Sequence, residues 1–432
     1  MKKKRLFTLI GSICLSLVLA ALLLPACAPA EEEEEVGTVK IGFPGAFSGA
    51  GAMWFLPGKT GLAIWQDEIN DAGGIEVGGK RYLVEVVYYD DEFIPSKTIA
   101  GVKKLVLEDD VKMLIVCCGA PIAAIQPFIN EQEILVLSQV MYESDPDRPW
   151  TLGVGECAPF YSAMGMQYAA DIYPEIKRVA VLGQDEEVSH IHTAWTVAGA
   201  EAAGLEVVYN KFFACDTIDF APIVSAVLAT EPDLISMPAA WPEFRILIVE
   251  QCYLQGYKGE FESSECEVTD IYRKVPAGYI EGFITYRPGY LTDLSLPKRS
   301  RDYFQKWLAR YGPGAPEDID REPMPIDHQY ANEAWVWEYG VKLADSFEPR
   351  AVRDALLAAK EVPTQYGMGI WWGEEIVGVN QLLAHPTGII QIEGTKYVAK
   401  TYLDHRDWFN EGNNAEIALK HLEEKGLLWW QE

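Results

Sequence analysis

Positive charge and cysteine are both scarce in this sequence. Its 432 residues include 36 lysines and arginines against 64 aspartates and glutamates, which gives a formal net charge of -28. A basic surface for nucleic acid is therefore excluded. The eight cysteines include no C-x-x-C spacing, so neither a zinc site nor a thioredoxin-like redox centre is expected. With 49% hydrophobic residues the chain is long enough for two or three folded domains.

Long apolar runs are absent after the first 24 residues. A membrane-spanning helix requires about 18 consecutive apolar residues, which excludes a protein with several membrane spans. The one long run, residues 6–24, follows four basic residues and is typical of a secretory signal. It ends in Leu24-Pro25-Ala26-Cys27, which resembles the bacterial lipobox. We therefore expect cleavage before Cys27 and a lipid on its thiol; the alternative is an ordinary signal peptide.

The exported chain begins with an acidic segment. Residues 31–35 are five consecutive glutamates without apolar periodicity, which predicts an extended tether that repels itself. Outside the cytoplasm disulfides are possible. We expect Cys252 and Cys266 to be the pair that forms one.

From residue 39 onward, segments of strand and helix character alternate. Runs such as Leu114-Ile115-Val116 are continuously apolar, as in parallel sheets that are covered on both faces. This pattern predicts an α/β fold with two doubly wound lobes in tandem. Expected strands are 39–43, 82–89, 113–116, 134–137, 178–182, 205–212 and 234–237, and expected helices include 62–69, 95–106, 193–203, 220–228, 246–254, 300–311, 327–345, 349–360 and 415–424, with a hairpin over 388–402.

Several segments, in a particular order and spacing, carry a family resemblance. They are residues 39–49, 67–75, 88–91, 105–109, 179–182, 219–220, 231–233, 353–356 and 392–394. Together they resemble bacterial solute-binding proteins of the branched-chain amino-acid type, the extracytoplasmic receptors of ABC importers. The resemblance covers roughly residues 38–402.

The resemblance implies two Rossmann-like lobes joined by a three-stranded hinge, with the ligand held between them. It divides the chain into a signal (1–26), a tether (27–37), an N-terminal lobe (38–156 plus 285–386), a C-terminal lobe (157–284 plus 387–403) and an extension (404–432). In open α/β sheets, ligands bind at the carboxyl ends of the strands. The loops expected at the ligand are 45–56, 117–121, 138–144, 184–190, 237–243 and 263–267.

The resemblance also points to binding residues in these loops. Family members commonly hold the ligand carboxylate with amides and hydroxyls at a helix start. The matching residues Cys118, Gly119 and Ala120 lack hydroxyls and leave only backbone amides. The other expected ligand-binding residues are Trp54, Tyr142, Val188, Trp241 and Glu265, of which Glu265 matches an acidic position that pairs with a ligand ammonium.

The predicted function is capture of a small organic solute for an ABC permease by a monomeric, lipid-anchored receptor outside the cytoplasmic membrane. An apolar or aromatic amino acid or a related carboxylate is the expected ligand, and a neutral amide-type solute is the alternative. A sensory module for a membrane receptor is a second possible function. Because no nucleophile and base occur in a catalytic pattern, we expect no enzyme activity, no cofactor and no metal; His190 and His192 are expected to be surface residues.

Overall fold

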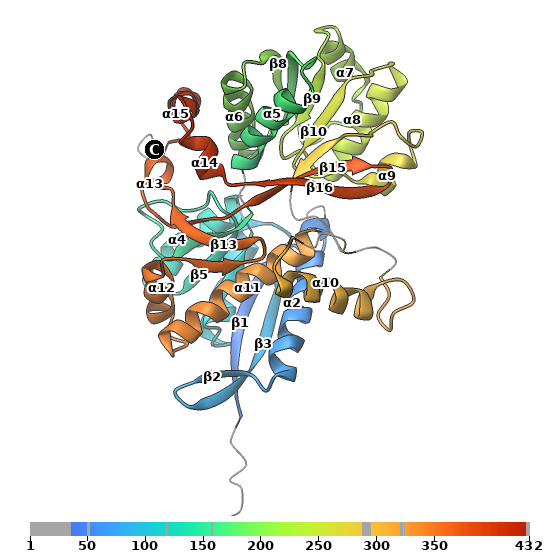
Figure 1. Cartoon of the computed structure of the whole chain (residues 1–432). Helices are drawn as coiled ribbons and strands as arrows, with labels where there is room; N and C mark the ends of the chain where they lie inside the picture. Colours follow the sequence, from blue (N-terminus) through green and yellow to red (C-terminus); the bar gives the residue numbers. More distant parts are fainter. Residues whose placement is uncertain are drawn as a thin grey trace, which may run out of the picture.

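The computed structural model describes residues 36–49, 52–117, 119–156, 159–286, 295–319, 323 and 325–428. The expected signal, residues 27–35 of the expected tether, which include Cys27, and Cys118 lie outside these residues, whereas Gly37 begins the first strand. Figure 1 shows two α/β lobes, one above the other, each with its own sheet. Within the described residues, no helix has the length and apolar character needed to cross a membrane.

The first lobe has a nine-stranded sheet in the order β12-β13-β14-β6-β5-β4-β1-β3-β2. Its central strands are parallel, whereas β2, β12 and β13 pair antiparallel at the edges. The strands are β1 (Gly37–Gly45), β2 (Ile75–Val77), β3 (Lys80–Asp90), β4 (Met113–Val116), β5 (Leu135–Val140), β6 (Thr151–Glu156), β12 (Val362–Thr364), β13 (Gly367–Trp372) and β14 (Leu382–Ala384).

Both faces of this sheet are covered by helices. Along β4, Met113 and Ile115 pack into one core while Leu114 and Val116 pack into another, because successive side chains point to opposite faces. The predicted parallel sheet with two covered faces is therefore confirmed. The helices of this lobe are α2 (Ala52–Asp71), α3 (Pro95–Leu107), α4 (Gly119–Gln132), α10 (Lys298–Tyr311), α11 (Pro325–Ala344), α12 (Pro349–Ala358) and α13 (Glu374–Val377).

The second lobe repeats this plan with a seven-stranded sheet in the order β16-β15-β11-β10-β9-β7-β8. Along β7, Val179 and Val181 face one core and Ala180 and Leu182 the other. Its elements are α5 (Phe160–Ile172), β7 (Arg178–Gln184), α6 (Glu187–Ala202), β8 (Glu206–Phe213), α7 (Ala221–Leu228), β9 (Leu234–Met237), α8 (Pro242–Leu254), β10 (Glu260–Ser263), α9 (Val268–Tyr272), β11 (Ile284–Tyr286), β15 (Thr387–Glu393) and β16 (Lys396–Leu403).

The chain passes between the two sheets three times: after β6, after β11 and between β14 and β15. The predicted pair of doubly wound lobes with a three-segment hinge is thus confirmed. The predicted lobe boundaries stay a prediction; β11, at the boundary placed near residue 285, pairs with β10 and β15 of the second sheet.

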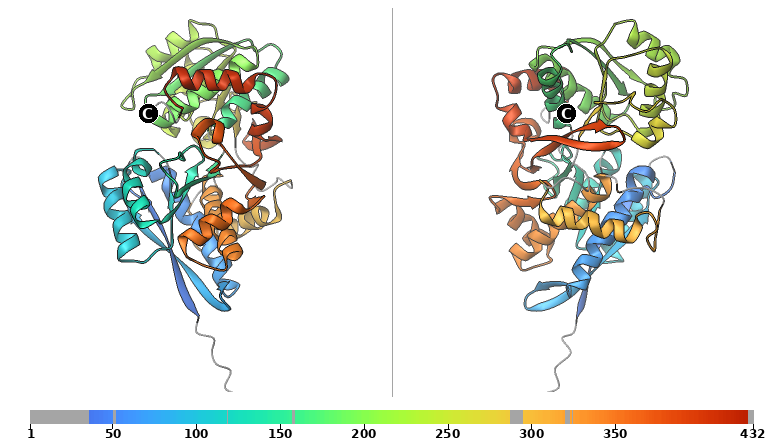
Figure 2. Two further views of the ribbon diagram at one scale, coloured as in Figure 1. Left: turned by 90° about the vertical axis from the view of Figure 1, so that its left-hand side faces the viewer. Right: turned by 45° about the vertical axis from the view of Figure 1, so that its right-hand side comes forward.

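The C-terminal residues pack as two short helices on the second lobe, α14 (His405–Phe409) and α15 (Asn414–Glu424). Figure 2 shows them, in red, against the green helices α5 and α6. Trp408, Phe409 and Leu422 are buried in the same core as Phe160 and Trp195. The helix expected over 415–424 is confirmed, whereas α14 was not predicted.

The predicted bridge between Cys252 and Cys266 is wrong, since both are buried free thiols. Arg245, near the start of α8, ion-pairs with both sequence neighbours of Cys266. Cys252 lies seven residues after Arg245 on the same helix, about two helical turns away, so the two cysteines are held by different parts of the lobe.

Candidate functional site

In the first lobe, carboxylates connect the loops that follow β1 and β3. Asp90 accepts hydrogen bonds from the Phe47 N–H (2.9 Å) and the Ser48 hydroxyl (2.7 Å). Beyond it the backbone takes two consecutive left-handed residues, Glu92 (φ 53) and Phe93 (φ 58). Asp91 supports this turn by accepting from the Phe93 N–H at 2.9 Å. The turn fixes the position of the Phe93 ring, whose centroid lies 5.7 Å from that of Phe55.

The loops that follow β4 and β5 are joined at the start of α4. Gly119 has a φ of 67°, a conformation that favours glycine, and its N–H donates to Glu143 Oε1 at 2.7 Å. The Arg148 guanidinium lies 3.4 Å from the other oxygen of Glu143. The first N–H groups of a helix are unpaired within it and attract anions. In this structure an internal carboxylate takes that position.

The second lobe meets the first at this point. A Cβ atom placed on Gly119 would lie 4.0 Å from Glu187 Oε2 and 4.0 Å from the Phe93 ring. Glu187 is the first residue of α6, directly after β7, so loops at the carboxyl ends of both sheets come together here. We call Phe93, Gly119, Glu143 and Glu187 the interlobe cluster.

The Glu143 carboxyl is unusually hard to ionise. Its burial raises its pKa to about 7 against the lowering effects of the Gly119 N–H and of Arg148, and repulsion from Glu187 adds to the rise. At neutral pH the group therefore exchanges readily between its charged and neutral forms.

In the second lobe, hydrogen bonds connect the loops after β7, β9 and β10. The Gln184 side chain accepts from the Trp241 N–H at 3.0 Å, and the Ser189 hydroxyl donates to the Pro238 carbonyl at 2.8 Å. Arg245, which is fully buried, donates to the Ala240 carbonyl and pairs with Glu265 at 3.1 Å. These bonds connect the three loops at the carboxyl ends of β7, β9 and β10.

The sequence and the fold identify the family. The sequence profile described as periplasmic binding protein matches residues 38–396, which is most of the chain. This chain belongs to the periplasmic binding protein family. The family consists of binding proteins, so the chain is a solute-binding protein and not an enzyme.

Solved structures share the fold of this periplasmic binding protein at low sequence identity. A leucine-binding protein from Thermotoga maritima is 16% identical, with 86% of this chain and 100% of that chain covered and a TM-score of 0.70. A branched-chain amino acid binding protein from Streptococcus pneumoniae, in complex with isoleucine, is 16% identical (85% and 99% covered, TM-score 0.68). A solute-binding protein from R. palustris, in complex with 4-hydroxybenzoate, is 17% identical (87% and 99%, TM-score 0.66).

In the first lobe, one expected ligand residue lies in the interlobe cluster. Gly119 is buried there, Ala120 beside it is exposed, and Cys118 is outside the described residues. Trp54 is half-buried in the first turn of α2 and packs against the core of its own lobe. Tyr142 donates from its hydroxyl to the Leu427 carbonyl at 2.7 Å, so its ring is held by the C-terminal residues.

In the second lobe the expected residues are spread over three loops. Val188 is half-buried, and its N–H donates to Glu186 Oε2 at 3.0 Å. Trp241 is half-buried and stacks on Phe244 with 6.0 Å between ring centroids. The Glu265 carboxylate is buried against Arg245. A ligand ammonium at Glu265 would therefore share that carboxylate with a fixed guanidinium.

Three residues of the interlobe cluster were missed by sequence reasoning. Glu143 and Glu187 fall within loops that were expected at the ligand, but nothing in the sequence distinguishes them from solvated carboxylates. Phe93 follows the strand whose end, Asp90-Asp91, carries part of the resemblance. A turn with two left-handed residues is not visible in composition, so the inward position of Phe93 could not be predicted.

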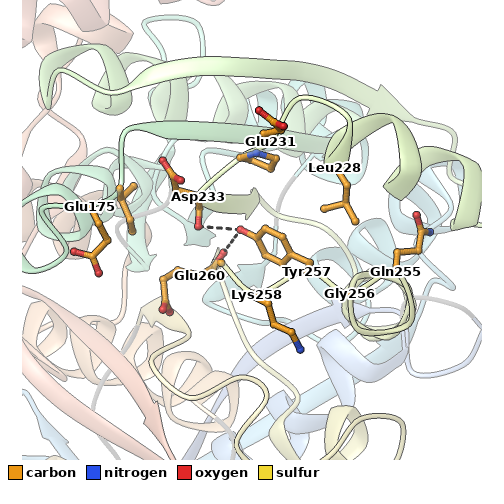
Figure 3. Close-up of a pocket in the computed structure, with 12 residues that line it drawn as sticks. Glu175, Leu228, Glu231, Asp233, Gln255, Gly256, Tyr257, Lys258 and Glu260 are labelled. Atoms are coloured by element: carbon orange, nitrogen blue, oxygen red, sulfur yellow. Dashed lines mark hydrogen bonds between the residues drawn. The ribbon is translucent and has the colours of Figure 1, made fainter.

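An open pocket of about 540 Å³ lies elsewhere, on the second lobe. Figure 3 shows its lining, in which the Tyr257 hydroxyl lies 3.0 Å from the carbonyl oxygens of Asp233 and Glu260. Asp233 precedes β9 and Glu260 begins β10, so this pocket is at the amino ends of the strands. The pocket therefore lies at the opposite ends of the strands from the loops around Glu187 and Trp241.

Of the two histidines expected at the surface, His190 is half-buried, whereas His192 is buried within α6, so the expectation is wrong for His192. His190 lies 2.9 Å from Asp185 and stacks on Phe212. In the part of the chain that the structure describes, no three His, Cys, Asp or Glu side chains are grouped to hold a metal ion.

Proposed function

We propose that this periplasmic binding protein is the extracytoplasmic solute-binding component of an ABC importer and captures a small organic solute by closure of its two lobes. The observation that carries the proposal is the approach of Glu187 to Gly119, because it joins the carboxyl-end loops of both sheets. Closure around a ligand brings such loops together and excludes water.

The receptor is held at the outer surface of the cytoplasmic membrane by a lipid on Cys27 and delivers its solute to permease subunits as a monomer. The acidic segment 31–35 separates the folded lobes from the membrane surface. Support for this arrangement comes from the lipobox-like end of the signal and from the family to which the chain belongs.

The solute has an apolar or aromatic part. Phe93 and Trp241 are half-buried aromatic side chains that follow the carboxyl ends of β3 and β9, and Trp54 is half-buried in the first turn of α2, which follows β1. Aromatic rings supply large contact areas for apolar ligands. Proteins of the same fold bind isoleucine and 4-hydroxybenzoate. Sequence reasoning favours an amino acid or a related carboxylate for this chain and leaves a neutral amide as the alternative.

Calorimetry against amino acids, aromatic acids and their amides tests the proposal. We expect one solute per chain to bind, and Trp241→Ala to weaken its binding at least tenfold because an aromatic contact is lost. Ile218→Ala is the matched control, since Ile218 is 92% exposed on the second lobe. If no solute in the panel binds, the receptor function is wrong.

A further inference from the structure

Two helices meet at the interlobe cluster. At the start of each, a carboxylate of the protein itself accepts hydrogen bonds from backbone N–H groups. Gly119 at the start of α4 donates its N–H to Glu143 at 2.7 Å. At the start of α6, Glu186 accepts from the N–H groups of Ser189 (2.6 Å) and Val188 (3.0 Å). Helix starts are the places where a ligand carboxylate would find unpaired N–H donors. In this structure the N–H groups of Gly119, Val188 and Ser189 already have carboxylate acceptors.

The remaining charges near Glu143 are also unfavourable for a second anion. Glu187 approaches the cluster from α6, and Asp145 lies on the same loop as Glu143. The neighbouring cation, Arg148, is shared between Glu143 (3.4 Å) and Asp145 (2.8 Å). A ligand carboxylate at Gly119 would have to displace Glu143 and then face the other carboxylates in a partly buried position.

We propose that Glu143 is a specificity-determining residue that excludes ligand carboxylates from the start of α4 and selects solutes that present an amide or ammonium N–H to Glu143 and Glu187. This inference rests on the proposed receptor function and names the chemical class of its solute. Carboxylate oxygens accept hydrogen bonds from such donors, and an ammonium gains charge attraction in addition. The amide-type alternative is therefore favoured over a free acid.

The preference depends on pH because the pKa of Glu143 lies near 7. Gly119 and Arg148 stabilise its charged form, while Glu187 and Asp145 oppose it. Above pH 8 the carboxylate is charged and the preference for an amine over an acid is largest. Below pH 6 it is mostly protonated, and the preference decreases.

Two matched ligand sets test the inference by calorimetry: benzoate, benzamide and benzylamine, and isovalerate, isovaleramide and isoamylamine. The full chain is expected to bind the amide or the amine at least tenfold more tightly than the acid. Glu143→Ala frees the Gly119 N–H and should reduce that ratio at least tenfold. Glu143→Gln keeps the shape and removes the charge, which covers the case in which the alanine variant does not fold.

Glu131→Gln is the control, because Glu131 is exposed near the other end of α4. This variant should show the same ratio of amide or amine affinity to acid affinity as the wild type. An acid that binds as tightly as its amide, or a ratio unchanged by both Glu143 variants, overturns the inference while solute binding itself stands. If no member of either set binds to any variant, this inference fails, while the receptor proposal is decided by the wider panel that includes amino acids.

Discussion

At the scale of single residues, Glu143 shows how a buried carboxyl group makes the stability of the fold depend on pH. In the unfolded chain its carboxyl group has an ordinary pKa near 4.5, whereas in the folded protein burial raises the pKa to about 7. Between these values the folded state holds a proton that the unfolded state has released. Folding is therefore favoured at the acidic end of this range and loses stability as the pH rises.

We predict that Glu143→Gln removes this dependence. Between pH 5 and pH 8 the free energy of unfolding of the wild type should fall by on the order of 1–3 kcal/mol more than that of the variant. Urea unfolding at four pH values measures the difference, with Glu131→Gln as a control that keeps the wild-type slope. Parallel curves for wild type and Glu143→Gln would show that Glu143 has an ordinary pKa in the folded state.

At the scale of elements, α14 and α15 complete the core of the second lobe. Phe409, which is 1% exposed, lies 6.3 Å from Trp195 and 5.3 Å from Trp372 between ring centroids. Trp372 belongs to β13 of the first lobe, and Tyr142 of the first lobe contacts Leu427. The C-terminal residues thus contact both lobes on one side of the molecule.

We predict that Phe409→Ala lowers the free energy of unfolding by about 3–5 kcal/mol, because truncation leaves a cavity in a packed aromatic core. Urea unfolding followed by tryptophan fluorescence measures the loss. Glu411→Ala, at an exposed position two residues away, should change stability by less than about 0.5 kcal/mol. An equal effect of the two substitutions would mean that α14 is not part of the core.

The regular elements were predictable from the sequence because hydrophobic periodicity reflects which faces are buried. The strands β4, β7 and β9 and the helices α10 and α12 occur within a few residues of their expected bounds. Short elements were missed: β13 and β14 have six and three residues, and α14 has five. Such segments owe their structure to pairing and packing with distant residues, which local patterns do not encode.

The candidate site was predictable only to the level of its loops. Topology alone places loops at the carboxyl ends of the strands. Three of the loops expected at the ligand contribute residues to the interlobe cluster. Which side chains converge depends on how the lobes approach each other, as Glu187 approaches Gly119. The ion pair of Glu265 could not be predicted for the same reason. Its partner, Arg245, lies twenty residues away on α8, and the sequence spacing does not indicate that the two side chains meet.

At the scale of the whole molecule, two separately built lobes are connected by three chain segments and meet at their carboxyl-end loops. Val140 and Leu382 of the first sheet pack in the same core as Trp195 of the second lobe, so a rotation of the lobes about the hinge would also move side chains of this shared core. In the proposed function, the loops connected through Asp90 and Glu143 in the first lobe would close on a solute against those connected through Gln184 and Arg245 in the second.

A crystal structure of the protein purified with its native solute tests the central claim most directly. We predict electron density for one small organic molecule between the lobes, in contact with Glu143 or Gly119 on one side and with Glu187 or Trp241 on the other. A solute bound instead in the pocket beside Tyr257, or on one lobe without contact to the other, would contradict the account.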